Sequence, residues 1–378
     1  MKIKYQVIVF IAILVASSPV CFSQMSLKDS NLITEFGKHL SSDLKKDNVH
    51  GSMSAAIIKN DHVIWEAAFG YASANKDMAA DTGTIYRVGS ITKTFTATLL
   101  MQLVEEGKIK LDDPVENYVP EVKSLKGYSN KTMITLRQLA SHTSGLKREP
   151  DMPGASVGPM EQWESILLSC IPYTSFKSRP GTAYQYSNMG YALLGLALER
   201  ASGVSYIQML KERIFVPLHM DDTFFSVPEN KISRLAEGIA NYDESIMDKV
   251  NSSPSLQGII YNFGGYNVPN GGIYSTPGDL AKFIISLTGK TSLLKPESLK
   301  EMQVIPPAGR NYGLGLTISK GKQMDQIGHS GGVPGYRAQF LVEQRSGYAV
   351  ILMRNYNNGK TNLGSDLQKL ILKLVKDE

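Results

Sequence analysis

The stretch that decides the fold reads "YRVGSITKTFTATLLMQLVEEGK" and spans residues 86–108. The apolar residues that follow Ser90 predict a long helix that ends at Glu106. Lys93 is the only charged residue from 88 to 104. A charged lysine is costly to bury without a partner. A single lysine in the first turn of a helix that otherwise reads as protein core therefore points to a chemical role.

The spacing of Ser90 and Lys93 suggests what that role is. Residues three apart share one face of a helix, so the amine and the hydroxyl can touch. Burial lowers the pKa of a lysine and makes it a candidate base, and the free N–H groups of a first helical turn can hold a developing oxyanion. A serine beside a base is the minimum for nucleophilic acyl transfer. However, Ser-x-x-Lys occurs six times in this chain, and it also fits a helix cap beside a lysine that reaches the surface.

Two further stretches carry candidate functional residues. Tyr186-Ser187-Asn188 stands at the start of a helix that Gly203 closes, and taken alone Asn188 fits a helix N-cap. His329 to Gly332 stands at the start of a predicted strand, where glycines allow another backbone or a ligand to come close. Taken alone, His329 fits an incidental loop histidine.

The rest of the chain predicts strands near both ends and helices between them. The predicted strands cover residues 52–60, 62–73, 312–319, 336–344 and 348–355, and the terminal helices cover 27–46 and 363–376. Between them, Thr276 caps a helix that has Pro277 at its first position, and Asp279 completes a capping-box pattern. We expect an α/β fold of the α+β type, with one antiparallel sheet built from both chain ends and flanked by helices. The sheet domain would comprise 24–89 and 311–378, and a mainly helical domain, 90–310, would be inserted in it.

The N-terminus predicts export. Residues 1–23 combine two lysines, an unbroken apolar run and a small-x-small cleavage site, which is the pattern of a secretory signal peptide. The apolar run is too short to span a bilayer, and we expect no membrane span in the mature chain. The protein is therefore expected to be periplasmic or extracellular. Cys170 would be the only cysteine left, so no intramolecular disulfide is expected.

Composition excludes several classes of protein. The chain is 42% hydrophobic and 20% charged, which is ordinary for a globular protein. Its formal charge of +5 falls to +3 when the two lysines of the signal peptide are removed, and its basic residues are scattered, so no nucleic-acid partner is expected. The sequence contains no metal-ligand cluster, no P-loop and no complete G-x-G-x-x-G motif. We expect neither a metal nor a cofactor.

Three motifs in order resemble a known superfamily. Ser90-Ile91-Thr92-Lys93, Tyr186-Ser187-Asn188 and His329-Ser330-Gly331 resemble the motifs of the penicillin-recognising serine hydrolases, which include class C β-lactamases, DD-peptidases and β-lactamase-like esterases. Supporting stretches are "LRQLASHTSGL" (136–146), "GGIYSTPGDLAKF" (271–283) and "YGLGL" (312–316). The resemblance covers nearly all of the mature chain and implies a β-lactamase/transpeptidase-like fold.

The resemblance also implies roles for individual residues. Ser90 would be the nucleophile, and Lys93 and Tyr186 would form a coupled acid/base pair, with either as the first base. Asn188 would hold Lys93 and the substrate amide, and the backbone N–H groups of Ser90 and Gly332 would form the oxyanion hole. The complete set implied for substrate and oxyanion binding is Asn188, His329, Ser330, Gly331 and Gly332.

His329 narrows the expected function. Class C β-lactamases usually have Lys-Thr-Gly at this motif, whereas a histidine is common among the DD-peptidases and esterases. The resemblance therefore implies an exported serine hydrolase that forms an acyl-enzyme on an amide or ester, either a D-alanyl peptide-type DD-carboxypeptidase or a β-lactamase-like esterase. One alternative is a class C-like β-lactamase. Another is a penicillin- or peptidoglycan-binding protein with slow turnover. The ligand would be a small molecule or short peptide, peptidoglycan-derived or a β-lactam.

The histidines carry three further expectations. If the substrate has a free carboxylate, protonation of His329 near its ordinary pKa of about 6.5 should strengthen binding. His142, in "SHTSGL", is interpreted as a structural histidine near a helix end. An α/β-hydrolase with Ser330 as its nucleophile, in the G-x-S-x-G pattern of "GHSGG" (328–332), would need a histidine downstream. No histidine follows Ser330, so this reading is set aside.

Overall fold

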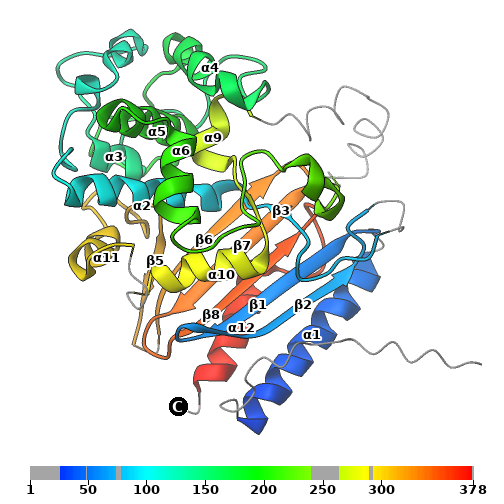
Figure 1. Ribbon diagram of the computed structural model, residues 1–378. Helices are drawn as coiled ribbons and strands as arrows, with labels where there is room; N and C mark the ends of the chain where they lie inside the picture. The colour runs from blue at the N-terminus through cyan, green and yellow to red at the C-terminus, as the bar shows by residue number, and fades with distance from the viewer. Residues whose placement is uncertain are drawn as a thin grey trace, which may run out of the picture.

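The computed structural model describes residues 26–47, 49–73, 78–239, 264–288, 293–322 and 324–376. The predicted signal peptide, residues 1–23, lies outside the described residues. A twisted sheet forms one part of the molecule, and a helical region lies against it (Figure 1). Strands from the two ends of the chain, blue and orange-red, run side by side in that sheet (Figure 1). The expected α+β architecture is therefore confirmed.

The main sheet has six antiparallel strands in the order β2-β1-β8-β7-β6-β5. The strands are β1 (Ser52–Lys59), β2 (His62–Gly70), β5 (Thr317–Lys320), β6 (Asp325–Val333), β7 (Tyr336–Glu343) and β8 (Tyr348–Arg354). The N-terminal hairpin joins the C-terminal strands through β1 and β8, with Ala55 opposite Leu352. A separate two-stranded pair, β3 (Tyr86–Arg87) and β4 (Tyr274–Ser275), lies next to the start of the Ser90 helix.

Two strand predictions need correction. The stretch predicted as a strand at 312–319 becomes regular only at Thr317, because Gly315 has a positive φ of 70° and Gly313 N–H bonds back to Leu316 O at 2.9 Å. The glycine-containing motif at His329 does not open a strand. It occupies the second half of β6, which begins at Asp325 and pairs with β7 along its whole length. β5 pairs with the first half of β6 only, up to Gly328, so pairing with β7 imposes the strand on the motif where the glycines alone predict a weak one.

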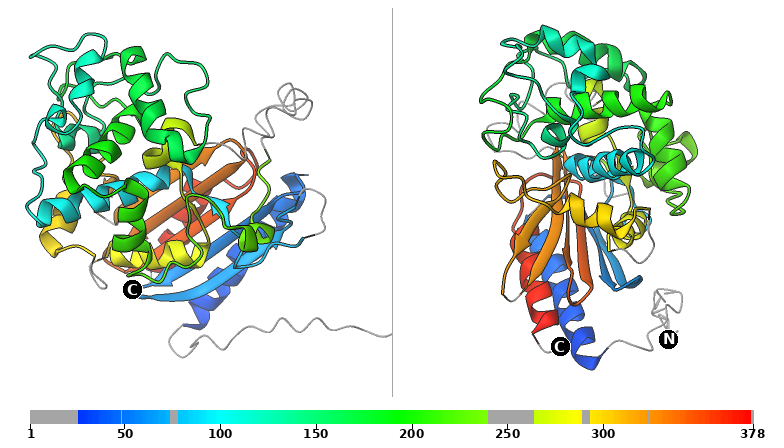
Figure 2. Two further views of the ribbon diagram at one scale, coloured as in Figure 1. Left: turned by 45° about the horizontal axis from the view of Figure 1, so that its top comes forward. Right: turned by 90° about the vertical axis from the view of Figure 1, so that its left-hand side faces the viewer.

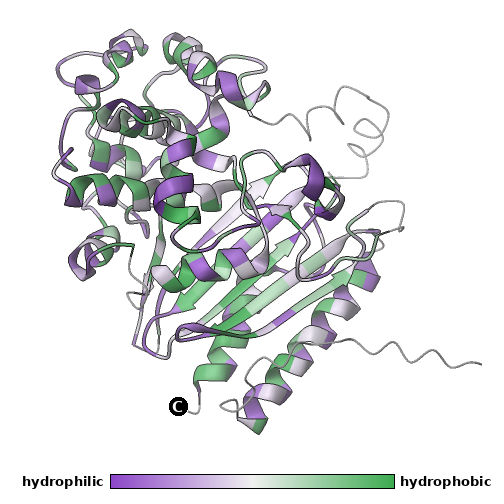
Figure 3. Ribbon diagram, viewed as in Figure 1, coloured by the Kyte–Doolittle hydropathy of each residue, from purple (hydrophilic) through white to green (hydrophobic). Residues whose placement is uncertain are grey.

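Both faces of the sheet are covered. Helices α1 (Leu27–Asp47) and α12 (Leu363–Val375) pack on one face, and α10 (Pro277–Ser286) packs on the other, as Figure 2 shows. Alternate side chains of β1 point to opposite faces of the sheet. Ile57 packs in the hydrophobic cluster with α1 and α12, and Ile58 packs in the cluster on the other face. Burial on both faces explains the nearly continuous apolar sequence of the central strands, which are mostly green in Figure 3, whereas α1 alternates between purple and green.

The helical region is built around α2 (Thr92–Glu105), whose residues from 92 to 101 are all buried. Helices α5 (Asn188–Ser202), α6 (Tyr206–Leu210), α9 (Val268–Gly271) and α11 (Pro296–Met302) pack against α2, and α3 (Leu136–Ala140) and α4 (Trp163–Cys170) pack against α5. Short helical turns lie at Gly89–Ile91, Val115–Asn117, Pro120–Ser124, Met160–Gln162, Ile171–Tyr173, Lys211–Phe215, Glu229–Arg234 and Gly265–Asn267. Gly107 with a φ of 70° and Gly203 with a φ of 71° follow α2 and α5, as the sequence predicts.

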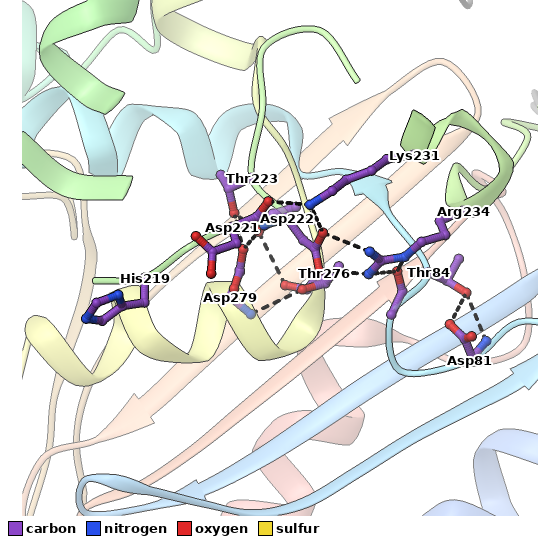
Figure 4. A network of polar contacts seen from close by, with 12 residues as sticks. Asp81, Thr84, His219, Asp221, Asp222, Thr223, Lys231, Arg234, Thr276 and Asp279 are labelled. Atoms are coloured by element: carbon purple, nitrogen blue, oxygen red, sulfur yellow. Dashed lines mark hydrogen bonds and ion pairs between the residues drawn. The ribbon is translucent and has the colours of Figure 1, made fainter. Parts of the chain in front are cut away.

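The predicted capping box of α10 is only half formed. Thr276 Oγ1 accepts a hydrogen bond from Asp279 N–H at 3.2 Å, but the buried Asp279 carboxylate bonds to a neighbouring loop instead of to Thr276 N–H. It accepts from Asp222 N–H at 2.7 Å and from the Thr223 hydroxyl at 3.0 Å. Asp222 in turn pairs with Arg234 at 2.8 Å. Asp279 therefore ties the loop from Asp222 to Arg234 onto the sheet-covering helix, in the network of Figure 4.

The domain boundaries at 24–89, 90–310 and 311–378 stay a prediction. Helix α10 falls in the segment expected to be a separate helical domain, yet it packs against β1, β2 and β8. Among the described residues, no helix combines the length and the apolar character needed to cross a membrane.

Candidate active site

Ser90 stands in a sharp turn pressed against β6. The turn Gly89–Ile91 begins with Gly89 at a positive φ of 53° and leads directly into α2. A Cβ on Gly89 would lie 2.8 Å from Gly332 N, and a Cβ on Gly331 would lie 1.8 Å from Val88 O. Only glycine permits these approaches. The glycines of the third motif thus allow the backbone of β6 to lie directly beside Ser90.

Lys93 is fully buried behind Ser90, with 0% of its surface exposed. Its Nζ lies 3.1 Å from Ser90 Oγ, 2.8 Å from Asn188 Oδ1 and 2.8 Å from Asn270 O. The pKa of Lys93 is well below the ordinary value, chiefly because burial penalises the ammonium and also because Arg148 is nearby. The reading in which Lys93 reaches the surface is therefore wrong, and the amine touches the serine as the spacing predicts.

Tyr186 joins this pair from the loop that precedes α5. Its hydroxyl hydrogen bonds with Ser90, which lowers the pKa of Tyr186, but burial has the larger effect and raises that pKa to about 12. Lys93 Nζ lies 4.9 Å from the centre of the Tyr186 ring. The three residues expected to act together, Ser90, Lys93 and Tyr186, therefore lie together in the structure.

The cap of α5 differs from the prediction. Ser187, not Asn188, is the N-cap, and its hydroxyl accepts from Gly190 N–H at 2.9 Å. The amide of Asn188 is therefore free for side-chain contacts. Its oxygen accepts from Lys93, and its nitrogen donates to Glu149 Oε1 at 2.6 Å.

A cleft of about 740 Å³ opens in front of Ser90. Its wall includes Tyr186 and the whole His329–Gly332 motif, whereas Lys93 and Asn188 are not part of the wall. The basic residues of the wall are Arg148, Arg337, Arg354 and Lys360, and none of the residues that line the cleft in the described part of the chain is an aspartate or glutamate. The cleft is consequently electropositive.

His329 does not behave as predicted. It is 4% exposed, and both ring nitrogens are occupied, with Nδ1 2.7 Å from Ser330 O and Nε2 2.7 Å from Tyr312 Oη. A carbonyl oxygen only accepts, so Nδ1 carries the proton and Nε2 accepts from the tyrosine hydroxyl. Burial, followed by the proximity of the Lys93 amine, lowers the pKa of His329 to about 3. The expected gain of charge near pH 6.5 is therefore wrong, and His329 is neutral at physiological pH.

The sequence interpretation missed several contacts of this site, and two of them involve Lys93 and the Tyr186 loop. Asn270 O, just before the supporting stretch 271–283, accepts from Lys93. His142, from the stretch 136–146, contacts the Tyr186 loop with its ring, its Nδ1 and its backbone carbonyl. Both lie in or beside stretches that the resemblance had singled out, and that was the only signal for them.

One group in the described part of the chain has the side chains to hold a metal ion. His39, Asp43 and Asp366 converge between α1 and α12 and are not part of the cleft wall. Lys46 lies 3.6 Å from Asp43, and Lys369 lies 3.2 Å from Asp366. These lysines neutralise the carboxylates, so the group is explained as an ion-pair cluster.

Comparison with known proteins extends these observations. Protein flp of Staphylococcus aureus (strain N315) is 27% identical over 329 residues, which cover 86% of this chain and 63% of that protein. Beta-lactamase-like protein 4 of Dictyostelium discoideum is 32% identical over 280 residues, which cover 69% of this chain and 47% of that protein. The chain thus spans between about half and two thirds of the length of these relatives.

Solved structures with the same fold include two hydrolases. The D-amino acid amidase from Ochrobactrum anthropi SV3, complexed with L-phenylalanine amide, superposes with a TM-score of 0.76 at 25% identity and covers 91% of this chain and 98% of that one. The D-stereospecific amidohydrolase from Streptomyces sp. gives a TM-score of 0.70 at 28% identity, with 90% and 97% covered. A family model described as Beta-lactamase matches residues 32–373. With its fold and its three motifs, this match shows that the chain belongs to the Beta-lactamase family of serine hydrolases.

Proposed function

We propose that Ser90 is the nucleophile of a hydrolase that cleaves an amide or ester bond through an acyl-enzyme. The single observation that carries this proposal is the set of three contacts around Lys93 Nζ. A neutral amine has two hydrogens and one lone pair. Asn188 Oδ1 and Asn270 O can only accept, so they take the two hydrogens. The lone pair is then left for the Ser90 hydroxyl, 3.1 Å away.

The pKa values support a division of labour between the two candidate bases. Burial keeps Lys93 neutral, which suits it to take the Ser90 proton as Oγ attacks the substrate carbonyl. With a pKa of about 12, Tyr186 is protonated at neutral pH and can donate to the leaving nitrogen or oxygen as its bond to the carbonyl carbon breaks. The proton on Lys93 then restores the phenol. Water repeats the sequence in reverse on the acyl-enzyme, releases the acid and regenerates Ser90.

We assign the remaining motif residues to the site that binds the oxyanion of the tetrahedral intermediate. The backbone N–H groups of Ser90 and Gly332 belong to segments in van der Waals contact, since Gly331 leaves no space between β6 and the Ser90 turn. Two converging N–H groups stabilise the negative oxygen of a tetrahedral intermediate. Ser330 is exposed on the cleft side of β6, where it can contact the substrate backbone.

The electropositive cleft favours a substrate with an anionic end. Arg337 stands opposite Gly332 across β6 and β7, beside the proposed oxyanion hole. We therefore infer a D-alanyl peptide with a free carboxylate as the substrate, ahead of a neutral ester. Neighbours of the same fold are named as a D-amino acid amidase and a D-stereospecific amidohydrolase, which supports this choice. The β-lactams share the carboxylate and remain the second candidate class.

We also propose that the protein is exported, to the periplasm or the extracellular space. The proposal rests on the signal-peptide pattern of residues 1–23. N-terminal sequencing of the protein recovered from cells tests it. A mature chain that begins near Gln24 is expected, and a chain that retains Met1 in the cytoplasm would contradict it.

Intact-mass time courses test the enzymatic proposal. The wild-type protein is mixed with a D-alanyl-D-alanine peptide, a short ester, a D-amino-acid amide and a penicillin, each in excess. We expect a transient acyl adduct with continuing product release for the peptide. An adduct that accumulates without turnover on every substrate would instead identify a slow penicillin- or peptidoglycan-binding protein. Failure of all four to acylate the protein would contradict the proposal.

A further inference from the structure

His142 brackets Tyr186 on both sides. Its carbonyl oxygen accepts from Gln185 N–H at 2.7 Å, and its Nδ1 accepts from Ser187 N–H at 3.1 Å. Its ring centre lies 4.0 Å from the ring centre of Tyr186. One residue thus fixes the backbone before the tyrosine, the backbone after it and the ring itself.

The backbone conformation of His142 indicates that its side chain has a functional role. His142 follows α3 in the left-handed region, with a φ of 59°, where glycine is the usual residue because it carries no Cβ. A non-glycine residue held there in a buried position points to a functional constraint. The imidazole is completely buried.

Nε2 of the His142 ring, which has no hydrogen-bond partner among the described residues, also indicates a functional role. Because Nδ1 accepts from Ser187, the hydrogen of the neutral ring is on Nε2. That Nε2 is buried without a hydrogen-bond partner in the described part of the chain. It lies among aromatic rings, with the Tyr312 ring centre 4.7 Å and the Tyr191 ring centre 5.0 Å from the imidazole centre. An apolar ring would avoid this unsatisfied N–H but would leave Ser187 N–H without its acceptor, so the contact at Nδ1 is the feature that explains a histidine here.

We propose that His142 is a positioning residue that holds the Tyr186 phenol beside Ser90, and that the decisive contact is the hydrogen bond from Ser187 N–H to Nδ1. Without this acceptor, Ser187 N–H has no partner, and the backbone from Tyr186 to Asn188 is no longer held in place. The phenol and the Asn188 amide, which both contact the Ser90–Lys93 pair, then shift together. Burial, with the basic groups Lys93, His329 and Arg148 nearby, holds the pKa of His142 far below its usual value, so Nδ1 stays an acceptor.

Two substitutions separate the acceptor from the ring. His142→Asn places an amide oxygen near the position of Nδ1, and asparagine tolerates a positive φ. His142→Phe keeps a ring against Tyr186 but has no acceptor. The matched controls are His219→Asn and His219→Phe, because His219 also has a positive φ, of 52°, but its side chain is exposed outside the cleft.

The activity measurement rests on the proposed function. We expect His142→Phe to lower kcat about 10- to 100-fold, the loss typical of a displaced catalytic group, with KM within about 3-fold of wild type. His142→Asn should recover most of kcat, and both His219 variants should match wild type. A His142→Phe enzyme with normal kcat, or a His142→Asn enzyme as impaired as His142→Phe, would overturn the inference. If His142→Phe does not fold, His142→Ala replaces it, since it also lacks the acceptor.

A second readout does not depend on activity. Hydrogen exchange at the Ser187 amide should be slow in the wild type and in His142→Asn and at least about 10-fold faster in His142→Phe. Equal exchange in all three would overturn the inference even if the wild type hydrolyses the peptide. An inactive wild type with the expected exchange pattern would refute the proposed function and leave the positioning contact standing.

Discussion

Replacing Arg337 tests which residue recognises the anionic end of the substrate. Arg337 is half-buried on β7 opposite Gly332, and its Nη1 occupies the space that a Cβ on Gly332 would need. No carboxylate in the described part of the chain pairs with it. A substrate carboxylate in the cleft would be its partner, whereas His329 is neutral and already has a hydrogen bond on each ring nitrogen.

The expected magnitude follows from the environment of Arg337. A hydrogen bond to a charged group contributes about 1.5–3 kcal/mol. Because the cleft is open and Arg337 is only half-buried, we take the lower limit, about 1.5 kcal/mol, which corresponds to roughly a 10-fold change in an equilibrium constant. Arg337→Leu should therefore raise KM for a D-alanyl-D-alanine peptide roughly 10-fold and leave KM for its methyl ester within about 2-fold.

The assay is a pH series of KM for the peptide and its methyl ester. Arg345→Leu is the matched control, since Arg345 pairs with Asp325 and does not line the cleft. With the pKa of His329 at about 3, the peptide's KM in the wild type should not change from about pH 5 to about pH 8 on account of this histidine. Equal losses for peptide and ester, or a peptide KM that falls with acid through about pH 6.5 in both wild type and Arg337→Leu, would refute the reasoning.

Three further predictions concern the proposed catalytic groups and their support. Lys93→Ala and Tyr186→Phe should each slow acylation about 10²- to 10⁴-fold in stopped-flow assays, and the double variant should be little slower than either; multiplicative losses would show that they act independently. Arg148→Met should move the acidic limb of the kcat/KM profile to higher pH, because Arg148 lowers the pKa of Lys93 and the amine must be neutral to accept the Ser90 proton. Solvent screening should keep this shift below about one pH unit, and an unchanged or downward-shifted limb would contradict the prediction. Gly331→Ala should lower the free energy of unfolding by about 1–3 kcal/mol in urea titrations, because its Cβ meets a backbone oxygen. Gly332→Ala should cost less, because its Cβ meets only the mobile end of Arg337, and equal costs would contradict this packing.

Much of the site could be predicted because its key relations are local. Ser90 and Lys93 are three residues apart on a helix whose apolar sequence predicts burial, so their contact follows from helical geometry. Runs of apolar residues near both ends of the chain predicted β1, β2, β7 and β8 of the central sheet, and Gly107 and Gly203 marked two helix ends. Local patterns of this kind need no knowledge of the remaining chain.

Apart from the cap of α5 and the start of β5, the errors concern contacts between segments far apart in the sequence. The charge state of His329 depends on burial and on Lys93, which belongs to a helix far away in the sequence. Arg337 faces the cleft because of the register between β6 and β7, which no single stretch specifies. Asp279 does not complete the predicted capping box, because its carboxylate accepts hydrogen bonds from Asp222 N–H and Thr223, more than fifty residues earlier in the chain. These outcomes are set by tertiary packing.

Mapping the acylated residue tests the central proposal most directly. The protein is treated with a fluorophosphonate or a penicillin, quenched with acid, digested and analysed by mass spectrometry, alongside Ser90→Ala and Ser330→Ala. We predict an adduct on the peptide that contains Ser90, absent from Ser90→Ala and retained in Ser330→Ala. An adduct on Ser330, or labelling that survives in Ser90→Ala, would contradict the assignment of Ser90 as the nucleophile.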